Sequence, residues 1–219
     1  IYTAGDANAD YDIFGDHISR FVHTIGYTSP HIKENRPSEQ QIYDILMGRR
    51  TDEEPGKPLP KGTTAREAYA DHVKDDMKEK YKQDFSHLTV TETIDSIEYF
   101  VFPNAFFFPG LQLSMVYRFR PNGVDGALFD LLFLRPKPID GPCPPPPEAF
   151  ELGVEDSYTK CPGTEFLGAV YDQDTNNLMS QTKGFKTSLK KGQSLGNYQE
   201  ARTRHLHQTI DKYLEGKNG

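Results

Sequence analysis

Four segments in the middle of the chain most constrain its fold, because each is rich in aromatic and β-branched residues and each ends at a turn signal. They are residues 96–102, 105–109, 111–120 and 127–135, separated by Pro103-Asn104, Pro109-Gly110 and Pro121-Asn122-Gly123. Such side chains pack well on a pleated surface, and connections this short join antiparallel neighbours. The sequence therefore predicts a run of consecutive antiparallel strands.

Helical patterns lie on both sides of these strands. Ser38 and Gln41 form a capping box before an apolar run, which predicts a helix from residue 38. A longer helix is predicted over residues 64–85, where an apolar stripe recurs every fourth residue among charged neighbours. Its members are Ala65, Tyr69, Val73, Met77 and Tyr81.

Two further helices are predicted over residues 170–184 and 197–214, with Ala201, Leu206, Ile210 and Leu214 facing inward on the last. Shorter extended pieces are expected at 11–14 and 18–22, and the proline-rich stretch 136–147 is expected to be irregular. This order predicts an α+β domain, an antiparallel sheet with helices over one face and a long C-terminal helix.

Composition excludes several classes of protein. The net charge of −7 argues against a nucleic-acid or anionic-membrane partner, and no stretch approaches the roughly 20 apolar residues of a membrane span. Cys143 and Cys161 read as ordinary thiols of a cytoplasmic protein. With no histidine beside or between them, they cannot carry a Rieske [2Fe–2S] cluster, which needs two cysteines and two histidines.

The stretch 170–184, VYDQDTNNLMSQTKG, carries the strongest candidate for chemistry. It places Asp172, Asp174 and Asn176 near the predicted start of a helix, with Gln181 about two turns later. A carboxylate there is either a helix cap or one arm of a 2-His-1-carboxylate iron site, and spacing alone leaves both open.

Histidine partners for that carboxylate are not evident from the sequence. His205 and His207 are two apart on a predicted helix and so face different sides. His17 and His23 flank an extended piece and are the remaining pair that could join Asp174 in a triad. The aromatic segments could also line an apolar ligand cavity instead of forming plain core.

Five segments resemble, in the expected order, the alpha subunit of Rieske non-haem iron ring-hydroxylating oxygenases. They are GDANADYDIFGDHISRF, IEYFVFPNAFFFPG, YRFRPNG with LRPKP, the YDQDTNNL stretch, and NYQEARTRHLHQTIDKYL. The resemblance covers nearly the whole chain, so residues 1–219 are expected to form the C-terminal part of the catalytic, mononuclear iron domain.

The resemblance implies a helix-grip fold around Fe(II), which activates O₂ to hydroxylate an apolar, aromatic substrate by mono- or dioxygenation. Electrons would come from a Rieske [2Fe–2S] cluster, supplied by a reductase and in some members a ferredoxin. The implied assembly is a homotrimer or an α3β3 complex. The implied iron ligand is Asp174 with Asp172 in reserve, Gln181 would orient groups near the metal, and the substrate would contact Asn104, Phe102, Leu167 and Val170.

The chain also departs from the family pattern. It lacks the C-x-H and C-x-x-H motifs of the Rieske domain and the E-x-Y-H-x₄-H motif of the iron histidines, which is expected just before Ile1. His17 and His23 lack the preceding Glu-x-Tyr and have a different spacing. The isolated chain is therefore expected to be inactive. The alternatives are a helix-grip module that binds an apolar ligand without redox chemistry, and a non-catalytic assembly subunit.

Overall fold

The computed structural model describes residues 9–29, 32–50, 52–164, 167–190 and 192–217. The chain divides into two compact units, one made of residues 1–141 with 195–219 and the other of residues 142–194. Each unit is described by itself.

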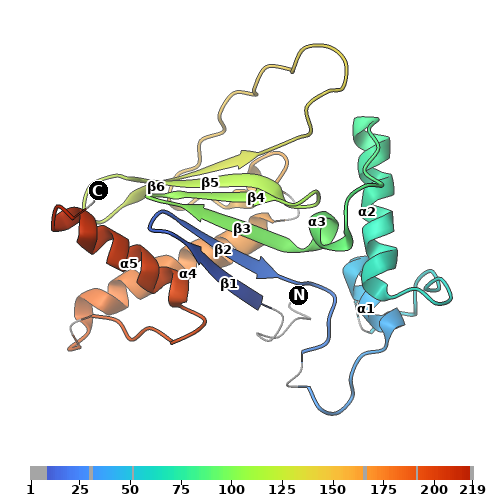
Figure 1. Ribbon diagram of the computed structural model, residues 1–219, viewed down its shortest axis with the longest axis horizontal. Helices are drawn as coiled ribbons and strands as arrows, with labels where there is room; N and C mark the ends of the chain where they lie inside the picture. The colour runs from blue at the N-terminus through green and yellow to red at the C-terminus, as the bar shows by residue number, and fades with distance from the viewer. Residues whose placement is uncertain (1–8, 30–31, 51, 165–166, 191, 218–219) are drawn as a thin grey trace. The chain divides into compact units, whose positions relative to one another are not determined.

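A six-stranded sheet forms the body of the first unit. Its strands are β1 (Ala9–Phe14), β2 (Ile18–His23), β3 (Ser96–Val101), β4 (Ala105–Pro109), β5 (Ser114–Pro121) and β6 (Ala127–Phe133). They lie side by side in sequence order, and every neighbouring pair is antiparallel (Figure 1). The predicted α+β class and antiparallel sheet are confirmed.

The register sorts the strand residues onto two faces, because successive side chains point to opposite sides. One face, called here the aromatic face, carries a row in which Phe100 pairs with Phe106, Phe106 with Tyr117, and Tyr117 with Leu131. The other, called the opposite face, carries a row running from Asp12 through Arg20, Tyr99, Phe107 and Val116 to Leu132.

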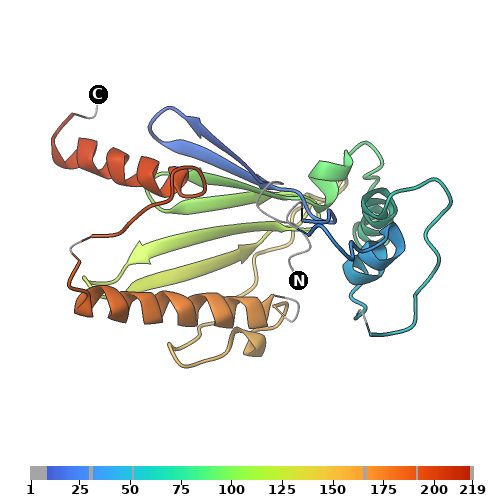
Figure 2. The ribbon, with the colours of Figure 1, turned by 90° about the horizontal axis from the view of Figure 1, so that it is seen from below.

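Three helices fill the connection between β2 and β3: α1 (Glu39–Leu46), α2 (Ala65–Tyr81) and α3 (Val90–Ile94). Ser38, Thr64 and Thr89 each form a capping box, as predicted for the first. The core of this cluster combines α1 residues with Ile94 and the predicted α2 stripe, except its last member, Tyr81. Figure 2 shows the three helices beyond one end of the strands, where β2 ends and β3 begins.

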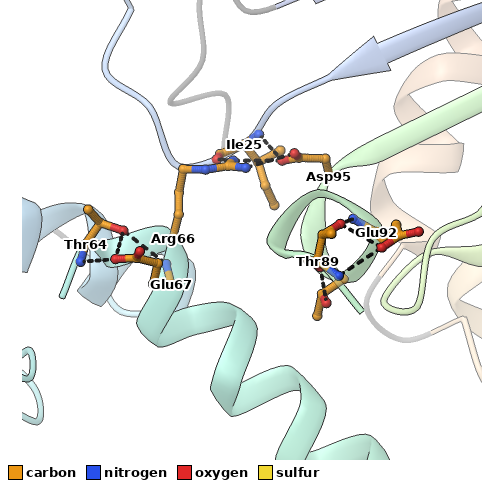
Figure 3. A network of polar contacts seen from close by, with 8 residues as sticks. Ile25, Thr64, Arg66, Glu67, Thr89, Glu92 and Asp95 are labelled. Atoms are coloured by element: carbon orange, nitrogen blue, oxygen red, sulfur yellow. Dashed lines mark hydrogen bonds and ion pairs between the residues drawn. The ribbon is translucent and has the colours of Figure 1, made fainter. Parts of the chain in front are cut away.

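A buried ion pair joins this helical cluster to the sheet (Figure 3). The guanidinium of Arg66 on α2 donates from Nη1 and Nη2 to the two carboxylate oxygens of Asp95, at 2.7 and 2.8 Å. Asp95 also accepts from the backbone N–H of Ile25 at 2.9 Å, and Arg66 donates to the Ile25 carbonyl. The pair therefore holds α2, the start of β3 and the segment after β2 together.

The last helix, α5 (Ala201–Leu214), packs by a polar face, which corrects the second half of the predicted inward stripe, since only Ala201 and Leu206 of that stripe are half-buried. His205 and Thr209 are buried, whereas Ile210 and Leu214 are exposed. His205 donates from Nε2 to the Gly15 carbonyl at 2.8 Å, and Thr209 donates from Oγ1 to the Asp16 carbonyl at 2.8 Å. The buried positions of this 14-residue helix therefore hold polar side chains, because they face backbone carbonyls of the β1–β2 turn.

The second unit contains a short 3-10 helix, η2 (Tyr158–Lys160), and α4 (Gly168–Thr187), the longest helix of the described residues. The proline-rich stretch 136–147 lies outside any helix or strand, as predicted. Of the helices in the described residues, none is long and apolar enough to cross a membrane.

Candidate functional site

Asp174 lies within α4 and does not cap it. The helix begins at Gly168, four residues earlier than Asp172, and its N-cap, Leu167, makes no side-chain capping bond. A Cβ on Gly168 would lie 2.9 Å from the backbone nitrogen of Thr159, so this glycine lets α4 begin against η2. The helix predicted over residues 170–184 therefore begins two residues later than the observed helix.

Asp172 has a structural partner on each carboxylate oxygen. It accepts from Ser157 Oγ at 2.6 Å and from the backbone N–H of Tyr158 at 2.9 Å. The hydrogen bond from Ser157, followed by that from the Tyr158 backbone, lowers the pKa of Asp172. Neither carboxylate thus caps α4, and Asp172 instead accepts from the first backbone N–H of η2, whose N-cap is Ser157.

Asp174 has a different setting. Its side chain is exposed, and among the described residues no hydrogen bond or ion pair engages its carboxylate. At about 100° of rotation per residue, Asp172 lies roughly 160° around the helix from Asp174. The two carboxylates therefore serve opposite sides of α4, one turned toward η2 and the other free.

The free carboxylate sits in an apolar stripe of α4. Val170, Leu178, Gln181 and Phe185 all lie within about 40° of Asp174 around the helix axis. Leu178 and Phe185 are 55% and 51% exposed. Val170, Asp174 and Gln181 thus share a face, as a site would need, and the 3.6-residue period points to Leu178 and Phe185 as two members that the sequence analysis missed.

Asn104 and Phe102 belong to the first unit. Asn104 follows β3, and its side chain donates from Nδ2 to the backbone carbonyl of Phe119 at 2.7 Å. The backbone carbonyl of Asn104 accepts from the Phe119 N–H at 3.0 Å. Phe102 stacks on Tyr213 of α5, with ring centroids 5.0 Å apart. Both side chains therefore have structural contacts, which leaves their predicted role in substrate binding a prediction.

His17 and His23 cannot form the candidate pair, in keeping with their departure from the family spacing. They lie at opposite ends of β2, and six residues of extended chain span roughly 20 Å. His17 also shares a hydrogen bond of 2.9 Å with the hydroxyl of Tyr213. Across the described ranges, no three His, Cys, Asp or Glu side chains gather into a group that could hold a metal ion.

The aromatic face offers an apolar wall in the first unit. Phe119 and Phe129 stack with centroids 4.5 Å apart, and Tyr117 and Phe106 meet them edge-on at 5.2 and 5.9 Å. Such pairs contribute stability beyond simple area burial. This wall is suited to core packing and to contact with an apolar ligand.

The comparison with protein families gives one match. The family described as ring hydroxylating alpha subunit (catalytic domain) matches residues 3–216. Neither the curated proteins nor the solved structures contain a significant match to the chain. The family match covers both units, the sheet and the α4 stripe.

Proposed function

Because the chain belongs to the family of ring-hydroxylating alpha subunits, as their catalytic domain, we propose that it hydroxylates an apolar, aromatic substrate within a terminal oxygenase. The proposed reaction uses Fe(II), O₂ and electrons from a Rieske [2Fe–2S] centre. One observation carries the proposal: Asp174 is a carboxylate without a partner among the described residues, set in an apolar stripe of α4.

The donor set fits an iron site only in part. A facial triad takes two histidines and one carboxylate, and Asp174 can supply the carboxylate. The described residues bring no histidine cluster to complete it. Bound Fe(II) would supply oxygen activation at its open positions.

The roles proposed for this chain's residues are binding and positioning. Asp174 would hold one coordination position, and Gln181, on the same side of α4, would orient groups around the metal. Val170 and Leu167 would exclude water near the carboxylate, and Asn104 with Phe102 would contact the substrate. An apolar pocket with few polar groups is the usual setting for such a ligand.

The proposed partners follow from the family. They are a reductase, in some systems a ferredoxin, and further subunits in a homotrimer or an α3β3 assembly. A cytoplasmic location, where thiols stay reduced, is in keeping with the unpaired Cys143 and Cys161. We propose no nucleic-acid partner, since the net charge is −7.

The experiment compares two isosteric variants in the assembled oxygenase, Asp174→Asn and Asp172→Asn. We expect Asp174→Asn to lose iron by metal analysis and to lose product formation. Asp172→Asn should keep its iron, because its carboxylate engages Ser157 and Tyr158 instead. Equal iron content in both variants would refute the assignment of Asp174.

The isolated 219-residue chain provides a second measurement. With one carboxylate from the described residues, we expect no stoichiometric binding of Fe(II) and no turnover. A tight one-to-one iron complex would contradict the proposal that the described residues supply only one iron ligand.

A non-redox ligand-binding module is the second candidate function, favoured by the stacked aromatic face. It predicts that the chain alone binds an apolar aromatic compound and that Asp174→Asn leaves this affinity unchanged. Binding of the aromatic compound by a protein that shows no iron-dependent turnover would favour the ligand-binding module.

A further inference from the structure

The opposite face of the sheet exposes several apolar side chains. It carries five large hydrophobic side chains that are between 38% and 48% exposed: Phe14, Ile18, Phe107, Leu128 and Leu132. A shallow hollow of about 640 Å³ lies beside Phe14, Ile18 and Phe107, and Tyr99 and Val101 of β3 also line it. Exposed apolar patches of a few hundred Å² or more mark interaction sites.

The two ends of this face carry opposite charge. At the β1 end, Asp12 is paired with Arg20 at 2.7 Å, whereas Asp10 is exposed and contacts no cation among the described residues. The alternation of the strand puts Asp10 and Asp12 on the same face. This end therefore has an excess of one negative charge.

At the β5–β6 end, two arginines share one carboxylate. Arg120 donates to Asp130 from Nε and Nη2 at 2.8 and 2.9 Å, and Arg118 donates only from Nε at 2.8 Å. Both guanidiniums are about half exposed. The excess here is one positive charge, carried most freely by Arg118.

We propose that the opposite face binds the same face of a second copy of this chain, forming a two-fold symmetric dimer. A two-fold axis at the centre of the interface exchanges the ends, so that Asp10 of each copy meets Arg118 of the other. The apolar side chains between them, centred on Phe107, then stack sheet on sheet. The self-complementary charges identify a second copy as the occupant.

The size of the face sets the expected affinity. Six strands at about 4.8 Å spacing and about 20 Å length give a sheet face of roughly 500 Å² on each copy. Burial of this area is near the lower limit for a specific interface. The dimer should therefore be weak, with a Kd on the order of 10 µM. This interface is additional to the proposed oxygenase function and does not depend on it.

Sedimentation velocity of the 219-residue chain over a concentration series tests the proposal. We expect a monomer–dimer equilibrium, which Phe107→Ser abolishes. Asp10→Lys and Arg118→Glu alone should each weaken the dimer by roughly tenfold, because each turns two symmetric attractions into repulsions. Both substitutions leave the Asp12–Arg20 and Arg120–Asp130 pairs in place.

Mixing the two charge variants gives the decisive outcome. An equimolar mixture of Asp10→Lys and Arg118→Glu should recover wild-type association as a heterodimer. The introduced lysine of one variant then meets the introduced glutamate of the other, while the unchanged Asp10 and Arg118 form the second contact. Recovery also shows that both variants are folded. A wild-type chain that stays monomeric at about 200 µM, well above the expected Kd, would overturn the proposal. So would a dimer indifferent to the charge reversals.

Discussion

The buried pair between Arg66 and Asp95 allows a quantitative test of what holds the helical cluster to the sheet. Their side chains are 9% and 0% exposed, so solvent cannot replace a lost partner. Asp95→Asn keeps the shape and still accepts from the Ile25 N–H, but it leaves the guanidinium charge uncompensated. Breaking a buried pair in this way costs about 3–5 kcal/mol.

An exposed pair of the same chemistry serves as the matched control. Arg20 and Asp12 meet at 2.7 Å, as close as Arg66 and Asp95, but their side chains are more than one-third exposed. Asp12→Asn should therefore cost about 1 kcal/mol or less. The distances are equal, so the difference between the two variants measures burial.

Thermal unfolding by circular dichroism is the assay. For a chain of this length, 1 kcal/mol shifts Tm by about 2–4 °C, so Asp95→Asn should lower Tm by roughly 6–20 °C and Asp12→Asn by about 4 °C or less. Replacing both Arg66 and Asp95 with apolar residues should recover much of the loss. Equal shifts for the two Asp→Asn variants would refute the claim that burial controls the energy.

Three further predictions concern single residues. Asp172→Ala should lower the free energy of unfolding by about 1–3 kcal/mol, because the Tyr158 N–H loses its acceptor, whereas Asp174→Ala should change it by less than about 0.5 kcal/mol in urea titrations. The neighbouring Arg120 guanidinium holds the pKa of Asp130 at about 2, so Asp130→Asn should destabilise the chain at neutral pH. That difference should vanish as pH falls through about 2, measured by unfolding at a series of pH values. Gly168→Ala should destabilise by about 1–3 kcal/mol, because its Cβ would clash with the Thr159 backbone; an unchanged Tm would contradict that clash.

The strands were predictable because the information that specifies them is local. Aromatic and β-branched runs between Pro and Gly turns gave β3 to β6 within a few residues of their observed bounds. The five-residue helix α3 has a Thr89–Glu92 capping box but was missed, since so short a stretch shows no helical period. The polar buried face of α5 was also out of reach, because the carbonyl acceptors of Gly15 and Asp16 lie about 190 residues away in the chain.

The candidate site was also predictable only where local sequence specifies it. Val170, Asp174 and Gln181 were named from the family resemblance, and helical spacing would have sufficed to place them on one side of α4. It could not distinguish Asp172 from Asp174, because that choice depends on Ser157 and Tyr158, which a loop brings back to the helix. The separation of His17 and His23 was within reach of the sequence, because the extended piece predicted over residues 18–22 lies between them.

The contrast between the two carboxylates is the strongest physical reason to assign chemistry to Asp174. Asp172 stabilises the fold, since both oxygens accept hydrogen bonds. Asp174 accepts none from the described residues and interrupts a stripe with the exposed apolar residues Leu178 and Phe185. Covering that stripe would leave a charge without water, which is unfavourable unless a cation or donor meets it. The proposed coordination of Fe(II) by Asp174 would supply that cation.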